Sequence, residues 1–155
     1  MNANSSKLAN IAGTVIVSAI SFIQVFTLGN IAPVRAADYC QCVEYIKRIY
    51  NIPSDVRVND AKDMIYSLPK LGFSQVDVQV GAVAIMQPSF PGSDRAVGHV
   101  ARVIQVRRVG GRTYITLRGA NQGGSGLDAN CSNVNNWRVR TPIDGHSDIS
   151  FWQPG

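Results

Sequence analysis

The chain has 155 residues, 45% of them hydrophobic and 16% charged, with 14 Gly and 7 Pro. This composition is typical of one globular domain and excludes a disordered or collagen-like chain. The 15 Lys and Arg exceed the 10 Asp and Glu and give a net charge of +5, while three cysteines make an odd count. The charge raises the question of an anionic partner, and the odd cysteine needs an explanation.

The N-terminal segment has the features of a secretory signal peptide. No charge occurs between Lys7 and Arg35, and residues 8–28 are mainly apolar. Small residues precede a cleavage site after Ala36, so we predict that residues 1–36 are removed and that the protein is secreted or periplasmic. The alternative is an uncleaved membrane anchor, because an apolar stretch of this length is enough to span a bilayer.

Removal of this segment changes the charge. It deletes two bases and no acid, which leaves 13 bases, 10 acids and a net charge of +3. Residues 37–94 carry 5 bases and 7 acids, whereas residues 95–155 carry 8 bases and 3 acids. The positive excess therefore lies in the second half of the chain.

The hydrophobic period predicts helices first and strands afterwards. Apolar residues recur at steps of three and four over residues 39–51, with Asp38 as the N-cap, and a second helix is expected over residues 61–68. Strands are predicted around residues 76–80, 82–86, 99–107, 112–117 and 149–152. The turn Val109-Gly110-Gly111 joins two of them as an antiparallel hairpin. This order predicts one α+β domain over residues 37–155.

Three residues have the chemistry of a cysteine nucleophile and its partners. Cys42 lies in the first turn of the first predicted helix, where backbone N–H groups and the helix dipole stabilise a thiolate. His99 begins a strand and Asn121 follows its hairpin partner, so folding can bring a base and an orienting amide together. The structural alternatives are a polar histidine at a strand edge and a buried cysteine that only packs.

Two local motifs surround these residues, Gln41-Cys42-Val43-Glu44-Tyr45 and Gly98-His99-Val100-Ala101. With the segments 60–63 and 80–84 between them, they resemble in order the CHAP family of cysteine- and histidine-dependent amidohydrolases and peptidases. The resemblance covers residues 39–122. It implies a papain-like α+β domain that cuts amide bonds in peptidoglycan, with Cys42 as nucleophile, His99 as general base and Asn121 as the third residue.

The chain departs from the family pattern at two positions. The family often has Glu two residues before the asparagine, where this chain has Gly119. Asn121 would then orient the imidazole alone, with less stabilisation of the imidazolium than a carboxylate provides. Ala82 stands where the family usually has an acid, which affects packing or solvation more than chemistry. Because Gly119 has no carboxylate, the alternative that the protein is a catalytically inactive, envelope-binding module stays open.

The resemblance implies catalysis through a thioester acyl-enzyme without a cofactor. We expect His99 to hold Cys42 as a thiolate in an ion pair, and the Cys42 backbone N–H to stabilise the oxyanion. Gln41 is a candidate second oxyanion donor, and its alternative is a solvated residue near a helix cap.

The other two cysteines, Cys40 and Cys131, are then predicted to form a disulfide in an exported protein. The alternatives are a Cys42–Cys131 bridge, which would inactivate the nucleophile, or no bridge. A Cys-x-Cys pair without a neighbouring histidine is a poor zinc site, so no metal is expected.

Several other side chains have structural and functional interpretations. His146 lies in a turn sequence and is expected at the surface. Trp137 and Trp152 either contact substrate or pack in the core. Arginines of the hairpin form a solvated sheet face or attract anionic envelope polymers: Arg102, Arg107, Arg108, Arg112 and Arg118. Export and the lack of a basic helix argue against nucleic acid as a partner.

The predicted function is a secreted cysteine peptidase or amidase whose partner is peptidoglycan or a peptide. It would act as a stem-peptide endopeptidase or an N-acetylmuramoyl-L-alanine amidase. The alternatives are an amidase for a non-peptidoglycan amide and an inactive CHAP-like module. Membrane contact is expected only through an uncleaved N-terminal segment.

Overall fold

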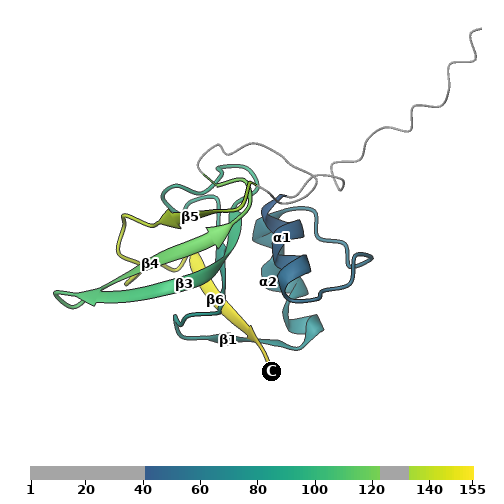
Figure 1. Ribbon diagram of the computed structural model, residues 1–155, viewed down its shortest axis with the longest axis horizontal. Helices are drawn as coiled ribbons and strands as arrows, with labels where there is room; N and C mark the ends of the chain where they lie inside the picture. The colour runs from purple at the N-terminus through teal and green to yellow at the C-terminus, as the bar shows by residue number, and fades with distance from the viewer. Residues whose placement is uncertain (1–40, 123–132) are drawn as a thin grey trace, which may run out of the picture. The chain divides into compact units, whose positions relative to one another are not determined.

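The computed structural model describes residues 41–122 and 133–155 (Figure 1). The predicted signal peptide and both partners of the predicted disulfide, Cys40 and Cys131, lie outside the described residues. The helices are α1 (Cys42–Ile49) and α2 (Met64–Ser67), the second flanked by 3-10 turns at Ala61–Asp63 and Pro69–Leu71. The strands are β1 (Phe73–Val76), β2 (Val83–Met86), β3 (His99–Val109), β4 (Arg112–Gly119), β5 (Asn135–Arg138) and β6 (Ile149–Pro154).

The strands form one antiparallel sheet in the order β1-β6-β2-β3-β4-β5. Figure 1 shows α1 and α2 together on one side of this sheet. The predicted α+β class is therefore confirmed. The predicted hairpin is formed by β3 and β4, whose turn contains Gly110 and Gly111 with φ of 57° and 74°, a region that favours glycine.

The core lies on both faces of the sheet around β2. Ile46 and Met64 of the helices pack on one face with Val83 and Ile85, while Ala84 and Met86 belong to a second buried cluster on the other face. Every residue of β2 is buried for this reason. The uninterrupted apolar sequence of β2, without polar alternation, is explained by contacts on both sides.

The first helix begins later than the sequence predicts. It starts at Cys42 with the extended residue Gln41 as its N-cap, three residues after the predicted start at residue 39. Asp38, the predicted N-cap, lies outside the described residues. The second predicted helix forms only four α-helical residues between two 3-10 turns. Because of the later start of α1, Cys42, the predicted nucleophile, is its first residue.

One predicted strand is misplaced, and one strand was not predicted. The alternation over 76–80 does not form a strand beyond Val76, and Val80 is 58% exposed. The chain must turn there, because β1 and β2 pair with opposite edges of β6. The sequence did not predict β5, because its residues Asn-Asn-Trp-Arg lack β-branched side chains. In the structure they pair with β4.

Several structural interpretations are confirmed. All five hairpin arginines are exposed, as expected for a solvated sheet face. His146 lies in a turn with Nδ1 3.1 Å from Asp148 Oδ1 and does not line the Cys42 cavity. Trp152 is buried in β6, and its Nε1 donates to Ser150 Oγ at 2.9 Å. In the described ranges, no helix is both long and apolar enough to cross a membrane.

Candidate active site

The first element of the site is the N-terminus of α1. Gln41 has extended backbone angles (φ −85°, ψ 173°), and its carbonyl accepts a hydrogen bond from the Tyr45 N–H at 2.9 Å. Val43 and Ile46 anchor the helix in the core, which fixes the direction of its first turn. The free thiol of Cys42 is therefore held, buried, where unpaired backbone N–H groups of the helix point.

The second element is the entry into β3. His99 pairs with Met86 of β2 and follows Gly98, whose φ is 75°. A Cβ at Gly98 would lie 2.5 Å from the Met86 carbonyl oxygen, so only glycine lets the loop approach β2 this closely. This close approach delivers the buried His99 side chain to the same end of the sheet as Cys42.

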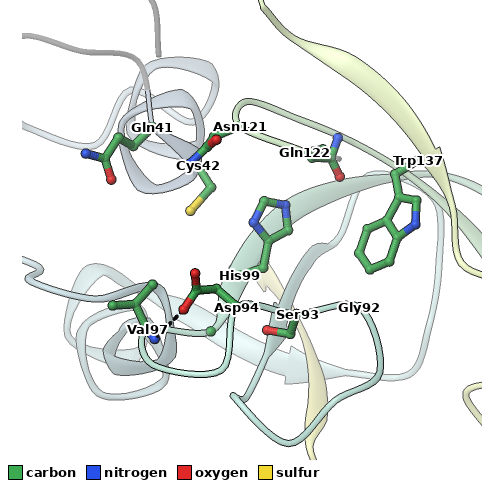
Figure 2. Close-up of a pocket in the computed structure, with 11 residues that line it drawn as sticks. Gln41, Cys42, Gly92, Ser93, Asp94, Val97, His99, Asn121, Gln122 and Trp137 are labelled. Carbon is green, nitrogen blue, oxygen red and sulfur yellow. Dashed lines mark hydrogen bonds between the residues drawn. The ribbon is translucent and has the colours of Figure 1, made fainter. Parts of the chain in front are cut away.

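Cys42 and His99 line one cavity of about 480 Å³ (Figure 2). Its other walls come from the loop residues 92–98, from Asn121 and Gln122 after β4, and from Trp137 of β5. Figure 2 shows one ring nitrogen of His99 on the side of the Cys42 sulfur and the other on the side of Gln122. The structure thus brings the predicted nucleophile and base together.

Gln122, which was not among the predicted site residues, also lines the cavity. It is only 3% exposed, and its Oε1 and the His99 Nε2 are both buried without a hydrogen-bond partner of standard geometry in the described residues. Gln122 lies close enough to raise the pKa of His99 as a hydrogen-bonding partner. Each of these two atoms is therefore available to satisfy the other, with Nε2–H as donor and Oε1 as acceptor.

The orientation of the Gln122 amide follows from its nitrogen. Nε2 donates to the Gly119 carbonyl at 3.1 Å and to the Asn135 carbonyl at 2.8 Å, with Asn135 Oδ1 3.3 Å away. A flipped amide would place its oxygen against these three oxygens, which is unfavourable. The amide oxygen must therefore face away from them, and in Figure 2 it is on the His99 side.

Asn121, the predicted third residue, lines the same cavity but is exposed. Its φ of 53° is a left-handed conformation that asparagine tolerates better than most residues. This turn breaks the strand alternation after β4 and brings the next side chain, Gln122, inward. No sequence signal separates the two neighbouring amides, since the choice depends on one backbone angle.

Gly119 explains how Gln122 fits. A Cβ at Gly119 would lie 3.2 Å from the Gln122 Cδ and 3.0 Å from the Ala101 Cβ. The Gln122 amide therefore occupies space into which a side chain at position 119 would extend. The departure from the family pattern at Gly119 is accompanied by a neutral amide in nearly the same place.

Burial shifts the pKa values of Cys42 and His99. It raises the pKa of Cys42 above the usual 9.0, partly offset by the N–H groups of Val100, Val43 and Cys42 itself. Burial also lowers the pKa of His99 below the usual 6.5, partly offset by Gln122 and Asp94. These directions favour a neutral thiol and a neutral imidazole at rest, whereas the sequence predicts a resting ion pair.

Two further residues that line the cavity are Trp137 and Gln41. Trp137 stands beside His99 with ring centroids 6.2 Å apart, and Gly92 leaves room for it, since a Cβ there would lie 2.7 Å from the indole. Gln41 lines the cavity as the N-cap, but its amide lies on the side of Cys42 away from His99 (Figure 2). Gln41 is therefore not aimed at the nucleophile in this structure.

No protein-family model, curated protein or solved structure matches this chain. The case for its chemistry accordingly rests on the residues of the cavity. Within residues 41–122 and 133–155, no group of three or more His, Cys, Asp or Glu side chains is arranged to hold a metal ion.

Proposed function

We propose that the protein is a papain-like cysteine amidohydrolase of the CHAP type that is exported and hydrolyses amide bonds of peptidoglycan. One observation supports this most directly: the free Cys42 thiol, at a helix N-terminus, shares a cavity with His99, whose far nitrogen faces the Gln122 amide oxygen. Nucleophile, base and orienting amide follow one another along the chain. This order agrees with the resemblance of the Cys42 and His99 motifs.

The mechanism begins from the neutral pair. With Gln122 accepting from Nε2–H, His99 presents its unprotonated Nδ1 to the thiol. The Cys42 proton moves to His99 as the sulfur bonds to the amide carbonyl carbon, and backbone N–H groups at the start of α1 stabilise the oxyanion. The C–N bond then breaks as His99 returns the proton to the leaving amine. Water, deprotonated by His99, hydrolyses the thioester.

The substrate class draws on the resemblance and on the surface around the cavity. The cavity lies at the surface, with Trp137 available to contact a sugar or peptide beside the cut bond. The strand register places four exposed arginines of β3 and β4 on one face of the hairpin, where they would attract the anionic polymers of a cell envelope: Arg102, Arg107, Arg112 and Arg118. Both stem-peptide endopeptidase and N-acetylmuramoyl-L-alanine amidase activities fit these features.

The test is mass spectrometry of purified peptidoglycan after incubation with the protein lacking residues 1–36. New fragments identify the bond: cleavage within the stem peptide or its cross-link marks an endopeptidase, and release of the whole stem peptide from muramic acid marks an amidase. A Cys42→Ala variant, the matched control, should release nothing. Fragments released equally by this variant would refute the proposal, and turnover of other peptides alone would place the activity on a non-peptidoglycan amide.

A second candidate is an inactive module of the same fold that only binds the envelope. Two observations favour it: the neutral Gln122 amide in place of a carboxylate, and the burial that raises the pKa of Cys42. Titration with iodoacetamide separates the two, since a Cys42 that stays unreactive at neutral pH lacks an activating base. Binding to insoluble peptidoglycan without fragment release would support the module.

A further inference from the structure

A single carboxylate stands at the edge of the Cys42–His99 cavity. Asp94 belongs to the loop 92–98, and its Oδ1 accepts hydrogen bonds from the backbone N–H groups of Ala96 and Val97 at 2.8 and 3.1 Å. In Figure 2 one of its oxygens is tied toward Val97, while the other points toward Cys42 and His99. The turn therefore fixes a carboxylate with one oxygen directed into the cavity.

No cation of the cavity lining neutralises this carboxylate in the described part of the chain. Among the described residues that line the cavity, Asp94 and His99 are the only ionisable side chains besides the thiol. Lys62 reaches the same loop, but its Nζ binds the Ala96 carbonyl at 2.9 Å and Asp60 Oδ2 at 3.2 Å. The backbone N–H groups lower the pKa of Asp94, so it is ionised at neutral pH.

Asp94 does little for the activation of the nucleophile. Its charge raises the pKa of Cys42, which opposes thiolate formation, and raises the pKa of His99, which favours the imidazolium. The two effects oppose each other in a proton transfer from Cys42 to His99. One oxygen of Asp94 closes the turn through Ala96 and Val97, whereas the other points into the cavity and is left for a group that it binds.

We infer that Asp94 binds a positively charged group of the substrate, so that the cavity selects amides with an ammonium group beside the cut bond. A free N-terminal amine or the side chain of a diamino acid has this chemistry. The inference rests on the proposed function, since it assigns a substrate class to the same cavity. Trp137, whose indole lies beside His99 in the cavity lining, offers an aromatic surface for the uncharged part of the substrate.

The first experiment measures charge selectivity without any hydrolysis. Cys42 is modified with a cationic, a neutral and an anionic methanethiosulfonate, and tandem mass spectrometry follows the modified Cys42 specifically. The ratio of cationic to anionic rate constants removes the effect of Asp94 on the thiol pKa, because every reagent reacts with the same thiolate. The protein is positively charged overall, so a preference for the cationic reagent opposes its net field.

The matched variant is Asp94→Asn, whose amide oxygen still accepts from Ala96 and Val97 while the charge is removed. We expect this variant to lower the cationic-to-anionic ratio about 5-fold at low salt, a screened surface effect. The control Asp77→Asn removes an exposed carboxylate that does not line the cavity, and should leave the ratio unchanged. An equal ratio in the wild type, Asp94→Asn and Asp77→Asn would overturn the inference.

Salt dependence of the wild-type ratio provides a test that needs no variant. The ratio should fall toward that of a free thiol as ionic strength rises to 1 M, because the Debye length shrinks to about 3 Å. A wild-type ratio independent of salt would exclude a bound cation and leave only a steric preference.

The second experiment uses substrate pairs, with each peptidoglycan fragment compared before and after acetylation of its free amines. The wild type should lose about 5-fold in kcat/KM on acetylation, and Asp94→Asn should lose nothing. Equal loss in both proteins contradicts the role of Asp94 and leaves the proposed function intact. If no fragment is cut by either protein, the proposed function fails, and the reagent ratio still decides whether Asp94 selects cations.

Discussion

Replacement of Gln122 by methionine tests the arrangement of the site most directly. The two side chains have similar length, but Gln122→Met removes the donor to the Gly119 and Asn135 carbonyls and the acceptor that faces His99. A buried group left without its hydrogen-bond partner costs about 1–3 kcal/mol. If the whole penalty falls on the imidazole during catalysis, kcat/KM decreases about 5- to 150-fold.

The matched control is Asn121→Gly. Asn121 is exposed and has a φ of 53°, a conformation that glycine adopts without strain. We expect this variant to keep kcat/KM within about 2-fold of the wild type, because it removes no buried partner of His99. The pair of variants therefore separates the two neighbouring amides.

The assay combines hydrolysis of peptidoglycan fragments with nitrogen-15 NMR of the imidazole. The chemical shifts of the two ring nitrogens report the tautomer, which a purely structural role of Gln122 would not alter. The wild type should show the Nε2–H form, and Gln122→Met should shift toward a mixture with a lower His99 pKa, since Gln122 raises it. The reasoning is refuted if Gln122→Met keeps the wild-type tautomer and rate while Asn121→Gly loses activity.

Three more outcomes follow from the same contacts. Burial lowers the pKa of His99, so activity should persist below pH 6.5 and disappear only as pH falls through that lower pKa; an acid limb above pH 6.5 in the kcat/KM profile would contradict this. Gly98→Ala should unfold at a lower urea concentration than Gly145→Ala. Both glycines have a φ of 75°, but only a Cβ at position 98 would meet a backbone oxygen at 2.5 Å. Equal unfolding midpoints would contradict the steric role of Gly98. The triple variant Ala101→Gly, Gly119→Glu, Gln122→Ala introduces a carboxylate at position 119 and removes both side chains that a Cβ there would meet. Its charge should raise the pKa of His99 and move the acid limb to higher pH, and an unchanged limb would contradict this.

The sequence by itself determined the class of fold and the two central residues of the site. Helical period before strand period predicted the α+β class, and the Gly110-Gly111 turn predicted the β3–β4 hairpin. The motifs around Cys42 and His99 selected the pair that the structure places in one cavity. These features are local, because period, turn residues and short motifs act over a few neighbouring positions.

Tertiary structure decided the features that depend on distant contacts. The strand at Val76 ends where the chain must pass to the other edge of β6, and β5 forms because β4 offers it an edge. The choice of Gln122 over Asn121 depends on one positive φ and on the carbonyl of Asn135, which lies 13 residues further along the chain.

The protonation of Cys42 and His99 is a second property that depends on tertiary structure. The helix N-terminus favours a Cys42 thiolate, which is all that the sequence indicates. The folded chain buries both Cys42 and His99, and the loss of solvation outweighs the backbone N–H groups and favours the neutral forms. Residue type and position along the chain thus selected Cys42 and His99 as the candidate pair, whereas packing sets the direction in which the pKa of each is shifted.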